Sequence, residues 1–288
     1  MLDELIPRIA DACAVLFPFD CMELAFMRRA MLGLLLIAPL AALSGVQVVN
    51  SRMSFFSDAI GHSAFAGVAI GLIFSPLPVD FSMPALALAI GMLIMYLRRG
   101  SRLSTDTVIG IIFSAVVAFG LAIVSRNREA SRDMNMFLYG DILTVSDNEI
   151  ALLAVLLVAF LVFQFFAWNR MLHISVNEQI AGVHRIKVAV YLYLFAALLS
   201  LVVILCVRAV GVLLVTAILI VPAATARNLA CNSRQLFFLS LFFSYVSCAG
   251  GLLISAQQWA GVPAGAAIVL LACAMFAVSF AAARFLRK

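Results

Sequence analysis

The sequence is poor in charge. Only 11% of its 288 residues are Asp, Glu, Lys or Arg, whereas 65% are hydrophobic. Soluble domains are about one quarter charged and about half apolar, so this composition excludes an ordinary soluble protein and predicts an integral membrane protein. No polar stretch is long enough to form a separate soluble domain. We attribute the net charge of +5 to basic loops at a membrane surface rather than to nucleic-acid binding.

Motifs of several other protein classes are also missing. The six cysteines are scattered without a C-x-x-C pair, which argues against a zinc ribbon or a redox motif. There is no H-E-x-x-H, and "GHSAF" at 61–65 fails the G-x-S-x-G pattern at Phe65, so we do not expect a catalytic chain. The N-terminus lacks a basic segment followed by a cleavable apolar core, so we expect no signal peptide.

Long hydrophobic runs dominate what is present. Nine stretches are long enough, or nearly so, to cross a bilayer, which takes about 20 helical residues. They predict an all-α fold, a polytopic membrane bundle of eight or nine helices at residues 30–51, 55–75, 81–97, 107–125, 150–168, 188–207, 209–226, 236–256 and 262–283. The sixth and seventh stretches abut at Arg208. Either a tight hairpin joins them, or the seventh is a shorter, partly re-entrant helix.

The distribution of charge indicates domains and orientation. We expect one transmembrane domain at 25–288, after an extracytoplasmic segment, 1–24, in which residues 2–19 could form an amphipathic helix on the membrane. One face of the bundle collects 12 of the 19 basic residues but only two acids, Asp106 and Glu178. Because basic loops stay in the cytoplasm, this face and the C-terminus are predicted to be cytoplasmic. The basic residues are Arg52, Arg98, Arg99, Arg102, Arg170, Arg185, Lys187, Arg227, Arg234, Arg284, Arg287 and Lys288.

The second span carries two ionisable side chains. Asp58 and His62 lie four residues apart in "SFFSDAIGHSAFAGVAIG" (54–71), so on a helix they share one face. Ionisable residues inside a span are costly and indicate a functional site. A carboxylate oxygen and an imidazole nitrogen one turn apart can both bind a divalent transition metal. Two ligands are too few for a closed site, so a second helix, a second copy or water must add others. A structural Asp–His hydrogen bond is the alternative.

A neighbouring strip of the same span consists of small residues. Ser63, Gly67 and Gly71 recur every four residues, which forms a surface that another helix can approach closely. We therefore expect this strip to be a helix-packing contact. The adjacent strip with Asp58 and His62 should then face a protein interior or a cavity rather than lipid.

Two further segments are predicted to lie on the cytoplasmic face. "VGVLLVTAILIVPAATARNL" (210–229) has Pro222 near its end, and proline bends or ends a helix. Residues 222–235 are therefore predicted to form a short basic loop that includes Arg227 and Arg234. "SVNEQIAGVHRIK" (175–187) is another short polar segment, in which Gly182 is predicted to end a helix.

These segments resemble the signature segments of permease subunits from ABC importers of zinc, manganese and iron. That family shows an R-M-x-x-x-x-D-A-x-x-H-A-x-x-P-G-V-A pattern and a V-G-x-L-L-V-x-A-L-L-I-x-P-A-A-T-A-R pattern. "SVNEQIAG" and "FLYGDILTVS" (137–146) resemble other family segments, and the resemblance extends from residue 24 to the end. Ser63 stands where the family pattern has alanine, and Ala66 stands where it has proline. The matching residues are Arg52, Met53, Asp58, Ala59, His62, Gly67, Val68 and Ala69, then Gly211, Leu213, Leu214, Pro222, Ala223, Ala224, Thr225, Ala226 and Arg227.

The resemblance implies that transport requires several different subunits. Such permeases have a type II-like architecture and pair as dimers in the bacterial cytoplasmic membrane, with separate ATPase subunits and an extracytoplasmic metal-binding protein. It implies that Asp58 and His62 bind the transported zinc, manganese or ferrous iron, with no resident cofactor. It also implies that Pro222, Arg227 and Arg234 belong to the ATPase-coupling element. The chain has no G-x-x-x-x-G-K-[ST], so ATP hydrolysis is expected in another chain.

Two other functions fit parts of the sequence. An ion-gradient-driven secondary transporter could use Asp58 and His62 as a proton relay, although the inverted repeats typical of such transporters are not evident here. An intramembrane enzyme fits least. The residues do not distinguish among zinc, manganese and ferrous iron, because mixed oxygen and nitrogen ligands suit all three.

Overall fold

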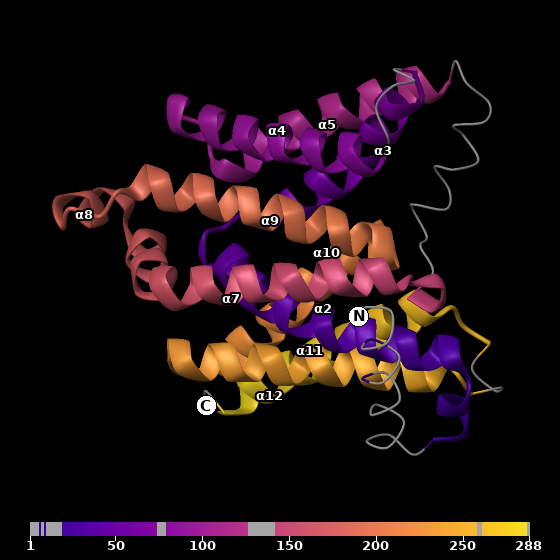
Figure 1. The fold of residues 1–288 in the computed structure, drawn as a ribbon. Helices are drawn as coiled ribbons and strands as arrows, with labels where there is room; N and C mark the ends of the chain where they lie inside the picture. The colour runs from indigo at the N-terminus through magenta and orange to yellow at the C-terminus, as the bar shows by residue number, and fades with distance from the viewer. Residues whose placement is uncertain are drawn as a thin grey trace. The chain divides into compact units, whose positions relative to one another are not determined.

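The structure, a computed structural model, describes Ile6, Ile9 and residues 19–73, 79–125, 142–257 and 261–286, and every regular element within them is helical. The short elements are the 3-10 helices η1 (Asp20–Glu23) and η2 (Ile142–Thr144) and the helix α8 (Glu178–Val183). The long helices (Figure 1) are α2 (Ala25–Asn50), α3 (Phe56–Ile73), α4 (Val79–Gly100), α5 (Thr105–Val124), α7 (Asp147–Val176), α9 (Val188–Val210), α10 (Val212–Leu229), α11 (Ser233–Ser255) and α12 (Ala264–Leu286).

Each long helix coincides with one predicted span, so the all-α membrane fold is confirmed. Among the described residues, eight of these helices are long and apolar enough to cross a membrane by length and composition. The chain is therefore a multi-pass membrane protein. The amphipathic helix predicted within residues 2–19 lies largely outside the described residues, as do positions 137–141 of the "FLYGDILTVS" segment.

The junction between α9 and α10 is a single residue. Gly211 adopts φ 85°, a conformation that L side chains rarely take, and α10 starts at the next residue. The predicted spans at 188–207 and 209–226 are thus two separate helices with a single residue between them. With 18 residues, α10 is at the short end of what a membrane crossing requires.

By its internal contacts the chain forms two compact units. The first contains residues 1–46, 139–157 and 208–288, in which α10, α11 and α12 contact one another pairwise. Buried polar groups fix these helices to each other and to α2. Ser244 of α11 donates a hydrogen bond to the Ala38 carbonyl of α2 (2.9 Å), and Asn228 of α10 donates one to Ser279 of α12 (3.0 Å).

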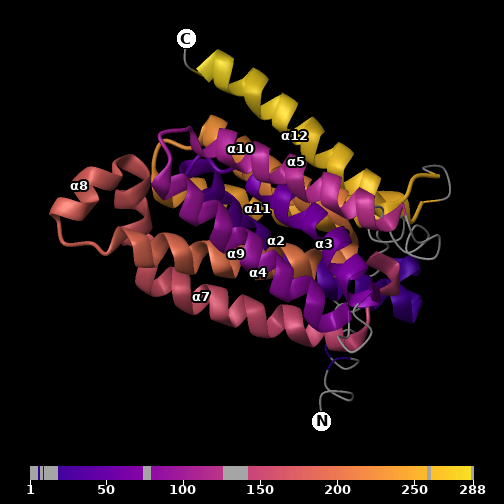
Figure 2. The ribbon, with the colours of Figure 1, turned by 90° about the horizontal axis from the view of Figure 1, so that it is seen from above.

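The second unit contains residues 47–138 and 158–207. Here α3 packs against both α4 and α5, and Figure 1 shows the three helices side by side. Helix α4 also approaches α9, because a methyl group added at Gly91 would lie 2.1 Å from Ser200 Oγ. In Figures 1 and 2, α8 extends beyond the adjacent ends of α7 and α9.

Candidate functional site

Asp58 and His62 lie one turn apart near the start of α3. Both residues are half-buried and take part in interactions within the described structure, whereas Ala59, Ile60 and Ser63 are fully buried. The pair therefore occupies the least enclosed face of this part of α3. The N-terminal end of a helix is also a favourable position for a carboxylate.

A neighbouring aromatic ring orients the imidazole. The ring of His62 meets the Phe113 ring of α5 edge to face, with centroids 5.2 Å apart and an interplanar angle of 78°. Such aromatic contacts favour one ring orientation over others. Phe113 thus holds the imidazole against one side of α3 and limits the directions in which its nitrogens can point.

The described residues of one chain do not form a closed metal site. In the part of the chain that the structure describes, no three His, Cys, Asp or Glu side chains come close enough to hold a metal ion. Asp58 and His62 can provide one oxygen and one nitrogen, which are suitable ligands for a transition metal.

The small residues of α3 lie where another helix comes close. Ser63, Gly67 and Gly71 are all buried, and a methyl group added at Gly67 would lie 2.9 Å from the Cα of Met83 in α4. Ser82 of α4 donates a hydrogen bond to the Gly67 carbonyl (2.8 Å). Ser63 Oγ donates to the Ile60 carbonyl (2.6 Å), so this buried hydroxyl is engaged with its own helix and offers no exposed nucleophile.

Residues 222–235, predicted as a loop, are mostly helical. Helix α10 continues through Pro222 to Leu229, and α11 begins at Ser233. The prediction overestimated the effect of proline, because side-chain hydroxyls and neighbouring helices in membrane bundles compensate for the missing N–H. Pro222 itself is buried and presents no surface to a partner.

The α10–α11 corner is nevertheless exposed and basic. Arg227 and Arg234 are both exposed. A reciprocal pair of hydrogen bonds fixes the corner: Gln235 N–H donates to Asn232 Oδ1 (2.8 Å), and Cys231 N–H donates to Gln235 Oε1 (3.0 Å). These bonds satisfy backbone donors at the start of α11 as a capping box does.

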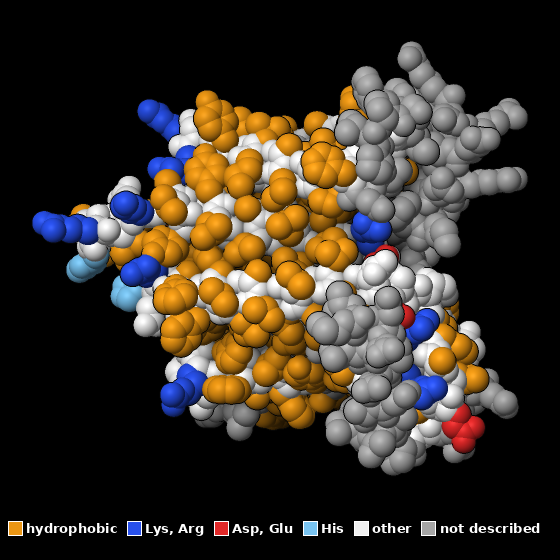
Figure 3. All heavy atoms as spheres, viewed as in Figure 1, with side chains coloured by type: hydrophobic (Ala, Val, Ile, Leu, Met, Phe, Trp, Pro, Cys, Tyr) orange, Lys and Arg blue, Asp and Glu red, His pale blue; other side chains and the backbone are white. Residues whose placement is uncertain are grey.

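A second surface was not recognised from the sequence. Three apolar side chains on and beside α8 are highly exposed: Val176 (86%), Ile180 (57%) and Val183 (82%). Figure 3 shows Lys, Arg and His side chains around this end of the second unit, whereas hydrophobic side chains cover the flanks of the long helices. The sequence feature that could have revealed this surface is a group of apolar residues among charged ones, outside any predicted span. Exposed apolar side chains outside the spans make this surface a candidate for contact with another protein.

Gly182 does not end α8 as predicted. The helix runs to Val183, and the residue with a left-handed backbone is Arg185, at φ 57°. Ile186 N–H then bonds back to the Ala181 carbonyl (3.2 Å), which is the pattern of a helix stop built on a left-handed residue. Arg185 takes the position that glycine usually occupies.

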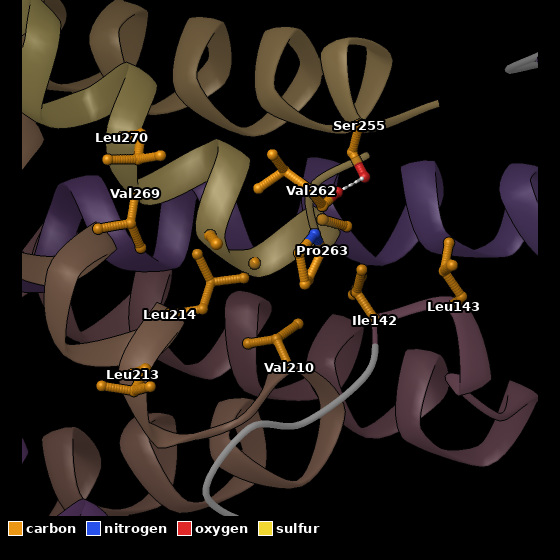
Figure 4. Close-up of a pocket in the computed structure, with 13 residues that line it drawn as sticks. Ile142, Leu143, Val210, Leu213, Leu214, Ser255, Val262, Pro263, Val269 and Leu270 are labelled. Atoms are coloured by element: carbon orange, nitrogen blue, oxygen red, sulfur yellow. Dashed lines mark hydrogen bonds between the residues drawn. The ribbon is translucent and has the colours of Figure 1, made fainter. Parts of the chain in front are cut away.

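The first unit contains an apolar cavity of about 910 Å³. Its lining is almost entirely aliphatic and includes Val210, Leu213, Leu214, Val262, Val269 and Leu270 (Figure 4). The Ser255 hydroxyl lies at its edge and donates to the Val262 carbonyl (2.8 Å). A lining without carboxylate, imidazole or thiolate offers no ligand to a metal ion.

Comparisons find relatives over most of the chain. The model of the ABC 3 transport family matches residues 23–283. The high-affinity zinc uptake system membrane protein ZnuB of Haemophilus influenzae is 29% identical over 245 residues, which cover 85% of this chain and 91% of that protein. The manganese import system permease protein ScaB of Streptococcus gordonii is 32% identical over 258 residues, covering 88% and 90% respectively.

A solved structure agrees in fold. PsaBC from Streptococcus pneumoniae, in complex with Fab, contains a chain that is 30% identical and matches with a TM-score of 0.75. The match covers 94% of the present chain and 95% of that one. Sequence and fold therefore point to the same group of proteins.

Proposed function

We infer a transport function from family membership: this chain belongs to the ABC 3 transport family and is a membrane permease subunit. Its cargo, we propose, is a divalent transition metal, namely zinc, manganese or ferrous iron. Relatives named for zinc and for manganese support this class of cargo. Family membership also favours ATP-driven import over the secondary transporter considered above.

The observation that carries the site assignment is the Asp58–His62 pair on the least enclosed face of α3. We propose that these two side chains bind the metal in transit. The alternative, a purely structural Asp–His contact, does not account for the placement of a transition-metal ligand pair inside a metal-importer fold. Low ligand number also suits transport, since the ion must leave as readily as it enters.

A second copy of the permease completes the site in our proposal. Two copies related by a twofold axis would bring two carboxylates and two imidazoles together, which makes a four-ligand set. The described part of one chain offers no third ligand of these types beside the pair, which supports a shared site. Water within one protomer is the other possible source of ligands.

Energy and delivery come from partners in this proposal. The chain lacks the phosphate-binding motif of ATPases, so separate ATPase subunits must bind it on the cytoplasmic side. Arg227 and Arg234 at the α10–α11 corner and the exposed apolar residues of α8 are the proposed docking surfaces. A metal-binding protein would deliver the ion on the opposite face.

The proposed orientation places the C-terminus in the cytoplasm of a bacterium. In the first unit, Arg227, Arg234 and Arg284 lie at or near the helix ends at which α10 and α12 finish and α11 begins. In the second unit, basic residues cluster where α4 and α7 end, around Arg98 and Arg170. Each unit considered by itself thus has a basic end, as cytoplasmic ends do.

Reconstitution tests the proposed function. The permease, co-expressed with a candidate ATPase subunit, should co-purify with it. In liposomes the complex should then take up zinc, manganese or ferrous iron only when ATP is supplied on the ATPase side. Uptake driven by a proton gradient without ATP would instead favour a secondary transporter.

A further inference from the structure

An ion pair joins α8 to α4. Arg98, in the last turn of α4, donates from Nη2 to Oε1 of Glu178, the first residue of α8. The Arg98 side chain is only 14% exposed, and that of Glu178 is 41% exposed. Arg98 Nη1 is buried and has no hydrogen-bond partner among the described residues. The guanidinium is thus largely removed from water and relies on Glu178 as its counter-charge.

Helix α8 needs such an anchor because it is too short to be stable alone. It has six residues, and isolated helices of this length do not persist in water. Its cap is local: Asn177 Oδ1 accepts from the Gln179 and Ile180 backbone N–H groups. The contact between Arg98 and Glu178 ties the start of α8 to the end of α4.

Helix α4 is fixed in turn to α3, the helix that carries the candidate metal ligands. Ser82 donates to the Gly67 carbonyl, and Met83 packs on Gly67 so closely that no side chain would fit. His62 lies five residues from Gly67 on the same helix. A continuous series of contacts therefore leads from α8 through α4 to Asp58 and His62, all within the second unit.

We propose that Arg98 and Glu178 are positioning residues that transmit movement of α8 to α4 and so to the metal pair on α3. The proposal rests on the function proposed above, in which an ATPase subunit acts on α8. A partly buried charged pair resists separation, because parting it leaves a desolvated guanidinium without its counter-charge. Helix α8 therefore cannot shift without drawing the end of α4 with it. Each cycle of ATP hydrolysis by the ATPase would thus alter the packing of α3.

A charge swap in the reconstituted permease–ATPase complex tests this role. We would compare wild type, Arg98→Glu, Glu178→Arg and the double swap for the amount of assembled complex and for ATP-dependent zinc or manganese uptake per complex. Each single reversal should lower uptake per complex roughly ten-fold, a size typical of residues that couple distant sites, with the ATPase subunits still bound. The double swap should recover most of the uptake.

Arg99→Glu is the matched control. This variant makes the same change of charge at the next position, where the arginine is exposed and the Arg98–Glu178 contact is kept. It therefore tests whether a reversed charge at the end of α4 alone disturbs the insertion of that helix. Uptake per complex should stay near the wild-type value. If charge reversal prevents assembly, Glu178→Gln replaces the single variants and should show the same fall.

Several results would overturn the proposal. One is normal uptake per complex in the single variants or in Glu178→Gln. Another is that fewer complexes assemble but those that do assemble transport metal normally. The third is that the double swap recovers no uptake. The first two would leave the ion pair with a purely structural role or none. A wild-type complex without ATP-dependent metal uptake would instead refute the proposed function itself, so the two failures are distinguishable.

Discussion

Gly67 of α3 lies so close to Met83 of α4 that the two helices are in backbone contact. A methyl group on Gly67 would lie 2.9 Å from the Cα of Met83 and 3.4 Å from its backbone nitrogen. A flexible side chain could move away from an added methyl group, but a helix backbone cannot do so cheaply. This contact therefore determines how α3 sits on α4, and with it the position of Asp58 and His62.

Enlarging Gly67 should loosen that contact. Overpacking a tight core site costs about 1–3 kcal/mol, so Gly67→Ala should lower the thermal unfolding midpoint of the detergent-solubilised permease. Gly67→Leu should go further and impair dimer assembly and transport. Gly110→Ala is the control, because a methyl group there would meet nothing within 4 Å. If Gly67→Leu left expression, dimerisation and transport unchanged, this account of α3 packing would be wrong.

The α10–α11 corner should depend on the cap of α11. Asn232→Ala removes the oxygen that accepts the Gln235 N–H, and loss of such a cap costs about 1 kcal/mol. The first-turn amides of α11 should then exchange with solvent several-fold faster, as hydrogen-exchange mass spectrometry would detect. Ser233→Ala alters the adjacent exposed position and should leave exchange unchanged. Equal protection in both variants would show that the cap does not hold the corner.

The basic corner should couple the permease to its ATPase. Arg227→Glu combined with Arg234→Glu reverses two exposed charges, so ATPase stimulation should be uncoupled from metal transport although the permease remains folded. The comparison is Arg99→Glu combined with Arg284→Glu, which changes two other exposed arginines. ATPase stimulation and uptake, measured on the same liposomes, report the coupling. Normal coupling in the Arg227 and Arg234 variant would exclude this surface as the docking site.

The sequence predicted the helices better than their ends and contacts. Uninterrupted apolar runs located all nine long helices that the structure describes, because a bilayer imposes one length and one composition on every span. Pro222 misled the prediction at the end of α10, since tertiary packing tolerates proline within membrane helices. Gly182 misled it at α8, where Arg185 takes the left-handed conformation instead.

The sequence predicted which residues form the candidate site but not which residues surround them. Helical spacing alone brought Asp58 and His62 to one face, because four residues make about one turn. The ring of Phe113 beside His62 and the contact of Gly67 with Met83 involve helices whose relative register no local pattern encodes. The Arg98–Glu178 pair was hidden for the same reason, since 80 residues separate its members.

A shared metal site makes a prediction about mixed dimers. If two copies of the permease contribute ligands to one site, a linked dimer with one wild-type copy and one Asp58→Asn, His62→Ala copy should lose nearly all metal uptake. Its ATPase activity and assembly should persist, because neither change reaches the proposed docking surfaces. A dimer in which Asp106→Asn and His173→Ala alter one copy is the control, since both residues are exposed. Uptake at half the wild-type rate would instead indicate a separate site in each copy.

The most direct test of the central claim is ATP-dependent uptake of radioactive zinc or manganese by liposomes that contain the permease–ATPase complex, with Asp58 and His62 changed singly. Asp58→Asn keeps the shape but removes the charge, and His62→Ala removes the ligand nitrogen. Each should reduce uptake at least about ten-fold, as expected when a metal ligand is lost, while the complex remains assembled and hydrolyses ATP. Wild-type uptake in both variants would contradict the assignment and leave the pair a structural contact.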